Sequence, residues 1–131
     1  GYKDFAECFK DRVNRREEWF NEICEFNKED PARLAKEIMK KANIYCGMRS
    51  DREIQKCIED EVFDHIIEIF NPHLPKESPE SFDINFDSLP KYYTIYNDSD
   101  LDTLRLRLME LIMKLNIIEL QKKVTKESVE I

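Results

Sequence analysis

The sequence predicts an all-α fold, a small disulfide-linked helical bundle of about four helices with a long packed proline-rich connection. Apolar residues recur every three or four positions over most of the chain, the spacing of a buried helix face. Only 2 glycines are present, too few for the tight hairpins of sheet proteins. The 4 cysteines in 131 residues are typical of a small domain held by disulfides.

Length and charge narrow the class of protein further. A chain of 131 residues predicts a single helical domain over 1–131, and 41% apolar with 37% charged residues suit a compact core under a charged surface. The net charge of -7 argues against binding to nucleic acid. The chain has no apolar run of about eighteen residues, so no membrane span is expected.

The first three helices are expected within 2–70. Helical spacing predicts one continuous helix from Tyr2 to about Asn27. Asp30 and Pro31 then supply a cap and a first-turn proline for a second helix that ends near Gly47. A capping box at 50–53 predicts a third helix that continues to Phe70.

A packed connection over 71–98 and a fourth helix over 99–122 complete the expected domain. Prolines interrupt the connection, but its aromatic residues predict that it packs over the bundle, with a short extended piece at 92–96. Ser99 and Asp102 predict the start of the fourth helix. Its main apolar seam comprises Leu101, Leu104, Leu108, Leu111, Leu115 and Ile118.

The fourth helix carries a second apolar strip on its opposite side. The strip comprises Leu106, Met109, Met113, Ile117 and Leu120. It is open to three interpretations: a homodimer contact, a lipid-facing surface, or core on both sides of the helix. Core on both sides is the expectation, because the long connection can cover the helix.

The cysteines predict two disulfides and therefore an oxidising, extracellular location. Free thiols and a zinc site are the alternatives. Cys8 and Cys24 lie sixteen residues apart on the expected first helix, so each must reach a different partner. Axial offsets weakly favour pairing Cys8 with Cys46 and Cys24 with Cys57. No signal peptide is visible at the start of the chain, which is expected of a mature secreted protein.

The residues that could carry chemistry are few, and no enzyme activity, metal or cofactor is expected. His65 has Glu61 four residues before it and Glu68 three after, but the chain lacks the two Glu-x-x-His units of a di-iron bundle, and His73 lies in a loop. Asp83-x-Asn85-x-Asp87 begins like a calcium loop, but lacks its glycine and its final glutamate. Tyr92, Tyr93 and Tyr96 form a candidate interaction surface, with the alternative that they cover the core.

Cys24 and the pair Tyr45–Cys46 resemble the cysteine–tyrosine–cysteine motif of the aphid salivary effectors called bicycle proteins. The resemblance covers the first 57 residues at most. It implies a helical protein that is secreted from salivary glands into plants and manipulates the host.

These observations together predict a secreted, non-enzymatic effector or binding protein that acts through its surface on a host or partner protein. The alternative is an extracellular carrier that holds a lipid or other small apolar ligand between disulfide-tied helices. Homodimerisation through the fourth helix is compatible with either function.

Overall fold

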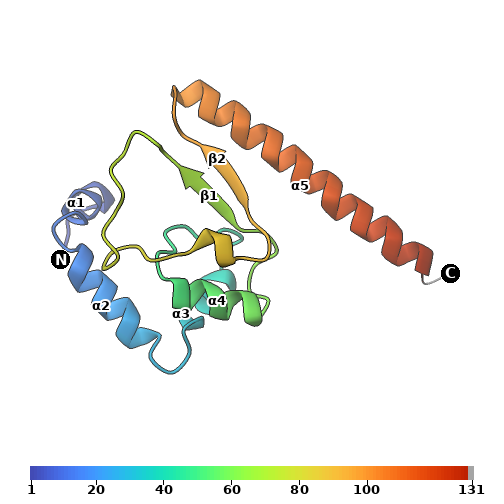
Figure 1. Ribbon diagram of the computed structural model, residues 1–131. Helices are drawn as coiled ribbons and strands as arrows, with labels where there is room; N and C mark the ends of the chain where they lie inside the picture. The colour runs from blue at the N-terminus through green and yellow to red at the C-terminus, as the bar shows by residue number, and fades with distance from the viewer. Residues whose placement is uncertain (130–131) are drawn as a thin grey trace. The chain divides into compact units, whose positions relative to one another are not determined.

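The structure is a computed structural model that describes residues 1–129. These residues form α1 (Phe5–Asp11), α2 (Arg16–Phe26), α3 (Arg33–Met39), α4 (Asp51–Glu59), β1 (Ile67–Phe70), the 3-10 turn η1 (Phe86–Ser88), β2 (Tyr93–Tyr96) and α5 (Leu101–Val129) (Figure 1). Strands β1 and β2 pair in parallel. The expected all-α fold is therefore wrong, because the structure combines helices with a small sheet.

The chain divides into two compact units. The first unit comprises 1–65 and 76–91, and so holds α1 to α4 with most of the proline-rich connection. The second comprises 66–75 and the chain from Tyr92 onward, and so holds both strands and α5. The single domain expected from the sequence stays a prediction.

The expected first helix is two helices, because the chain turns between Asp11 and Arg16. Backbone hydrogen bonds from Asn14 to Asp11 and from Arg15 to Arg12 form this turn. The Asp11 carboxylate accepts side-chain hydrogen bonds from Tyr2, Asn14 and Arg15 at 2.7–3.2 Å. These bonds favour a turn over continued helix, since they offer the side chains partners outside a regular helix.

The second and third helices are both shorter than expected. Helix α3 ends at Met39 rather than near Gly47, although Gly47 has the positive φ of 95° expected of it. Helix α4 begins at Asp51 as predicted, but Ser50 makes no side-chain capping bond. It ends at Glu59, because Glu61 takes a left-handed conformation with φ 53°.

The end of α4 is a Schellman motif, in which a left-handed residue closes the last turn. The Val62 amide donates to the Cys57 carbonyl at 2.9 Å, and the Glu61 amide donates to the Ile58 carbonyl at 3.1 Å. These are the two bonds that define the motif. Glu61 occupies the position where glycine is usual in this motif, so a count of glycines does not predict the motif.

The core of the first unit forms where α3 meets α4. Ala32, Ala35 and Cys57 are buried there, at 0–2% exposure. Larger side chains that are partly buried pack against these three: Tyr45, Met48, Val62 and Phe63. Small residues at the centre allow the backbones to approach closely.

The predicted disulfides are absent from the structure. Cys8, Cys24, Cys46 and Cys57 are all free thiols. Cys57 is buried in the core, whereas Cys24 and Cys46 are exposed. Cys57 therefore contributes to the core as a buried apolar side chain. The expected disulfide-linked bundle is wrong, because none of the four cysteines forms a disulfide.

Residues 67–70 form strand β1 instead of the end of the third helix. The segment is rich in isoleucine, whose branched side chain favours strands, and a short apolar run does not by itself distinguish strand from helix. The extended piece expected at 92–96 is confirmed as β2. Ile67 lies opposite Tyr93 and Phe70 opposite Tyr96 in the parallel register.

The fourth predicted helix is confirmed as α5, with different ends. It continues to Val129, beyond the expected end at 122. Its first turn is capped by Asp100 rather than Ser99, because the Thr103 amide donates to Oδ1 of Asp100 at 2.7 Å. Within its own unit, α5 runs beside the strands and extends well past them (Figure 1).

Candidate interaction surface

Helix α5 is fixed to β2 near its first turns. The Arg107 guanidinium donates to Oδ1 of Asp98 at 2.6 Å and also to the carbonyl of Tyr96. The hydrogen bond from Arg107 lowers the pKa of Asp98, which keeps this pair ionised near neutral pH. Arg107 thus joins the helix both to the end of the strand and to the loop that connects them.

The inner face of α5 carries most of the predicted apolar seam. Leu104, Leu111, Leu115 and Ile118 are half-buried, and the Lys114 ammonium lies 5.6 Å from the ring centroid of Tyr93. Leu101 is the most exposed member of the seam, at 61%. A helix of 29 residues is about 42 Å long, whereas a strand of four residues spans about 13 Å. The strands can therefore cover only part of this face.

The opposite face of α5 is an exposed apolar surface, here called the outer stripe. It comprises Leu106, Met109, Met113, Ile117, Leu120 and Val124, each 56–63% exposed. At about 100° per residue, these six side chains fall within about 80° of the helix circumference. The sequence predicted the strip but expected core on both sides of the helix, and that expectation is wrong.

The three candidate tyrosines do not form one surface. Tyr96 is 50% exposed and its ring meets that of Phe70 edge to face at 5.8 Å. Tyr93 lies three residues earlier on the same strand, so the two side chains point to opposite faces of the sheet. Tyr92 and Tyr93 are half-buried. Their role in binding stays a prediction.

The first unit contains a buried carboxyl group that sequence reasoning missed. Glu53 is 8% exposed and accepts a hydrogen bond from Nδ2 of Asn27 at 3.0 Å. Burial raises the pKa of Glu53, and the nearby Asp83 carboxylate raises it further. Oδ1 of Asn27 accepts the Leu34 amide at 2.9 Å, so this pair joins the turn before α3 to α4.

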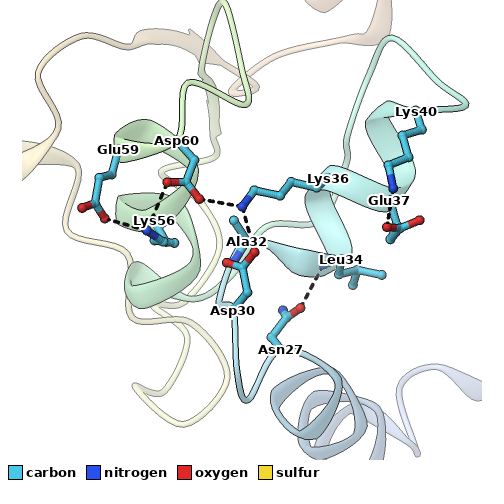
Figure 2. Close-up of polar contacts among 10 residues, drawn as sticks. All are labelled: Asn27, Asp30, Ala32, Leu34, Lys36, Glu37, Lys40, Lys56, Glu59 and Asp60. Atoms are coloured by element: carbon cyan, nitrogen blue, oxygen red, sulfur yellow. Dashed lines mark hydrogen bonds and ion pairs between the residues drawn. The ribbon is translucent and has the colours of Figure 1, made fainter.

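A cluster of charged side chains joins the turn before α3, α3 itself and α4 (Figure 2). The Lys36 ammonium lies 2.7 Å from Asp30 and 2.6 Å from Asp60, and Lys56 also contacts Asp60 at 3.0 Å. The hydrogen bonds from Lys36 lower the pKa of both aspartates. Every charge in the cluster has an opposite partner, so its role is to connect α3 with α4.

The calcium-like segment has a structural use. Oδ1 of Asp83 accepts the Asp51 amide at 2.7 Å, and Oδ1 of Asp51 accepts the Asn85 amide at 3.1 Å. The alternating polar residues thus attach the connection to the start of α4. Across residues 1–129, no group of three or more His, Cys, Asp or Glu side chains is arranged to hold a metal ion.

Neither candidate histidine lies on a helix. His65 lies in the segment between α4 and β1 rather than on a helix, and His73 Nε2 lies 3.2 Å from the Asp98 carbonyl oxygen. A depression at the start of the chain is open to solvent and lined by Tyr2, Glu7, Lys10, Asp11 and Asn14. Its polar lining is unlike the closed apolar cavity that a lipid carrier needs.

Comparison of the chain with known protein families, curated proteins and solved structures finds no match. Within residues 1–129, no helix combines the length and apolar character required to cross a membrane. The candidate interaction surface is therefore the outer stripe of α5 in the second unit.

Proposed function

We propose that this chain is a non-enzymatic binding protein that docks through the outer stripe of α5, and that the stripe pairs with a second copy of the chain. The observation that carries the proposal is a row of six large apolar side chains, each 56–63% exposed. Surfaces of this kind on soluble proteins mark interaction sites.

The size of the stripe supports a protein partner. From Leu106 to Val124 it extends over about 27 Å of helix. At roughly 120 Å² for each side chain, it exposes on the order of 700 Å², more than the largest apolar patch of a typical monomer. A standard protein interface buries about 800 Å² on each partner. The stripe with its polar margins is therefore large enough for one complete interface.

A second copy fits this face in shape and in charge. Two copies of one straight stripe can cover each other completely, as in an isologous dimer. The exposed charges at its margins have both signs, namely Asp102, Arg105, Glu110, Lys123 and Glu127. Opposite charges can therefore meet across the interface, although the whole chain carries -7.

Other uses of the chain have less support. The free thiols remove the disulfides that favoured an extracellular location, so the proposal does not depend on secretion. The resemblance to salivary effectors likewise rests on sequence alone. A carrier function would need an enclosed apolar site, which the depression at the start of the chain does not provide.

The test is sedimentation equilibrium of the purified chain over a wide concentration range, alongside Met113→Glu and Ile117→Glu. We expect a dimer for the wild type and monomers for both variants, because pairing would bury an unpartnered carboxylate at a cost of several kcal/mol. Ile44→Glu is the matched control: Ile44 is 74% exposed but lies outside α5, so this variant should remain dimeric.

Helix content, measured by circular dichroism, should be the same in all three variants, since each substituted side chain is exposed. A wild-type chain that stays monomeric at every concentration overturns the self-pairing. Equal weakening of the dimer by Ile44→Glu would overturn the assignment to the outer stripe.

A further inference from the structure

The outer edge of β1 displays unused backbone hydrogen-bonding groups. Its inner edge pairs with β2: the Tyr93 amide donates to the Ile66 carbonyl at 2.9 Å, and the Asn97 amide donates to the Phe70 carbonyl at 2.7 Å. In a parallel ladder of this register, the N–H and C=O groups of Glu68 and Phe70 face β2. Those of Ile67 and Ile69 therefore face away from it.

Both residues that carry the outward groups are exposed. Ile67 is 40% exposed and Ile69 is 64% exposed. Among the described residues, β2 is the only strand that pairs with β1. The other edge of this sheet is partly occupied, because Arg107 donates to the Tyr96 carbonyl. Of the two edges, the outer edge of β1 is the one that can accept another strand.

A third strand would enlarge a sheet that has only two strands among the described residues. Two-stranded sheets need a packed helix or further strands for stability, and parallel sheets are normally covered on both faces. Strand β1 also lacks proline or lysine, which commonly protect exposed edges. Its one charged residue, Glu68, accepts a hydrogen bond from Thr94 Oγ1 at 2.9 Å, which holds that side chain over the sheet.

The side chains of β1 indicate the kind of strand that fits. Residues opposite one another on paired strands share a face and contact each other. An incoming strand therefore meets Ile67 and Ile69 on one face, where apolar residues fit, and Glu68 on the other, where a cationic residue fits. The chain's net charge of -7 also favours a cationic partner.

A second β1 is a poor occupant of this edge. An antiparallel pair that uses all the outward groups of Ile67 and Ile69 would place Glu68 opposite the same residue of the other copy. Like charges directly opposite each other destabilise a sheet. The edge therefore selects for a different strand, which makes it independent of the self-pairing proposed for α5.

We propose that the outer edge of β1 is a strand-addition site for an extended peptide that pairs antiparallel with β1 and in which apolar residues alternate with lysine or arginine. Main-chain bonds to Ile67 and Ile69 supply the attachment, as in other proteins that bind peptides by adding a strand. Glu68 supplies the preference for a cationic side chain.

The test titrates the isotope-labelled chain with the capped peptide Lys-Val-Lys-Val-Lys and follows the backbone amides by NMR. We expect the largest shifts, and slower hydrogen exchange, at Ile67 and Ile69. The matched control is the same peptide with both valine nitrogens methylated. In the antiparallel pairing proposed here, the valine N–H groups face Ile67 and Ile69, so the methylated peptide keeps the charge but loses these donors, and binding should be lost.

Two variants test the specificity. Glu68→Lys should bind the lysine peptide about tenfold more weakly and should bind Glu-Val-Glu-Val-Glu about tenfold more tightly than the wild type does. Ile69→Pro removes one outward N–H while leaving the bonds to β2, and should also lose the lysine peptide. Equal binding of the methylated peptide, or shifts centred elsewhere, would overturn the proposal.

Discussion

Nδ2 of Asn27 donates a hydrogen bond to Oε1 of Glu53 over 3.0 Å, and both residues are buried although 26 positions separate them. Glu53 stands in the first turn of α4, where the sequence predicted a capping box with Ser50. Its side chain instead reaches Asn27 at the end of α2. Glu53 thus makes a tertiary contact between the end of α2 and the start of α4, in place of a local capping contact.

The Glu53→Gln variant should be more stable than the wild type at pH 7. Burial raises the pKa of Glu53 in the folded chain, so folding favours the protonated form. The contribution of protonated Glu53 to stability is fully present below the ordinary glutamate pKa. It is lost as the pH rises through the higher pKa of Glu53 in the folded chain. A neutral amide avoids that loss, with a gain on the order of 1 kcal/mol in urea unfolding at pH 7.

The advantage of Glu53→Gln should shrink as the pH is lowered toward 4, because the wild-type carboxyl then gains its proton. Glu25→Gln is the control. The Glu25 side chain is 76% exposed, so this change should stay within about 0.5 kcal/mol of the wild type. An advantage that grows on acidification would contradict a raised pKa for Glu53.

Substitution Glu61→Gly should stabilise the chain by about 1 kcal/mol. Glu61 holds φ 53°, a left-handed conformation that costs a side chain with a Cβ and costs glycine almost nothing. Thermal unfolding provides the measurement. The matched control is Glu59→Gly two residues earlier, inside the last turn of α4, where glycine should destabilise by up to about 1 kcal/mol. The same sign for both changes would exclude the Schellman motif as the cause.

Sequence reasoning succeeded where the determinants are local. The spacing of Leu104, Leu111 and Leu115 predicts α5, and the aromatic, β-branched segment at 92–96 predicts an extended piece that is now β2. Sequence reasoning failed for the element whose conformation depends on pairing with a segment distant in the sequence. The segment that became β1 has apolar residues compatible with helix or strand, and only the partner strand 26 residues later resolves the choice.

The outer stripe was predicted only in part, because its exposure also depends on long-range packing. Periodicity located the outer stripe on α5, but the exposure of Met113 and Ile117 depends on long-range packing, which periodicity does not report. The contact between Asn27 and Glu53 left no sequence pattern. Four cysteines suggested disulfides because small domains often need them, whereas here Cys57 contributes as a buried apolar side chain.

The thiols should differ sharply in reactivity. Cys24 and Cys46 are exposed, so a maleimide should label both in the folded chain. Burial raises the pKa of Cys57 to about 11, so little reactive thiolate is present and labelling should require unfolding. Mass spectrometry of labelled peptides gives the measurement. Before labelling, intact mass should be unchanged by reduction, and a gain of about two hydrogens would instead indicate a disulfide.

Replacing Lys36 by methionine should lower the urea midpoint at pH 7, because it removes the cation that lies between Asp30 and Asp60. The hydrogen bonds from Lys36 lower the pKa of both aspartates. Their contribution is therefore present above the ordinary aspartate pKa of about 4 and is lost as pH falls through the lower folded values. The difference in midpoint between wild type and Lys36→Met should accordingly shrink below about pH 4.

Lys40→Met is the matched control for this cluster, since Lys40 also contacts a carboxylate at 2.6 Å but pairs within a single helix turn. The side chain of Lys40 is 65% exposed, against 38% for Lys36, so solvent screens its ion pair more strongly. The midpoint should therefore change less in Lys40→Met than in Lys36→Met at pH 7. Equal changes would mean that bridging α3 to α4 adds nothing to an ordinary surface pair.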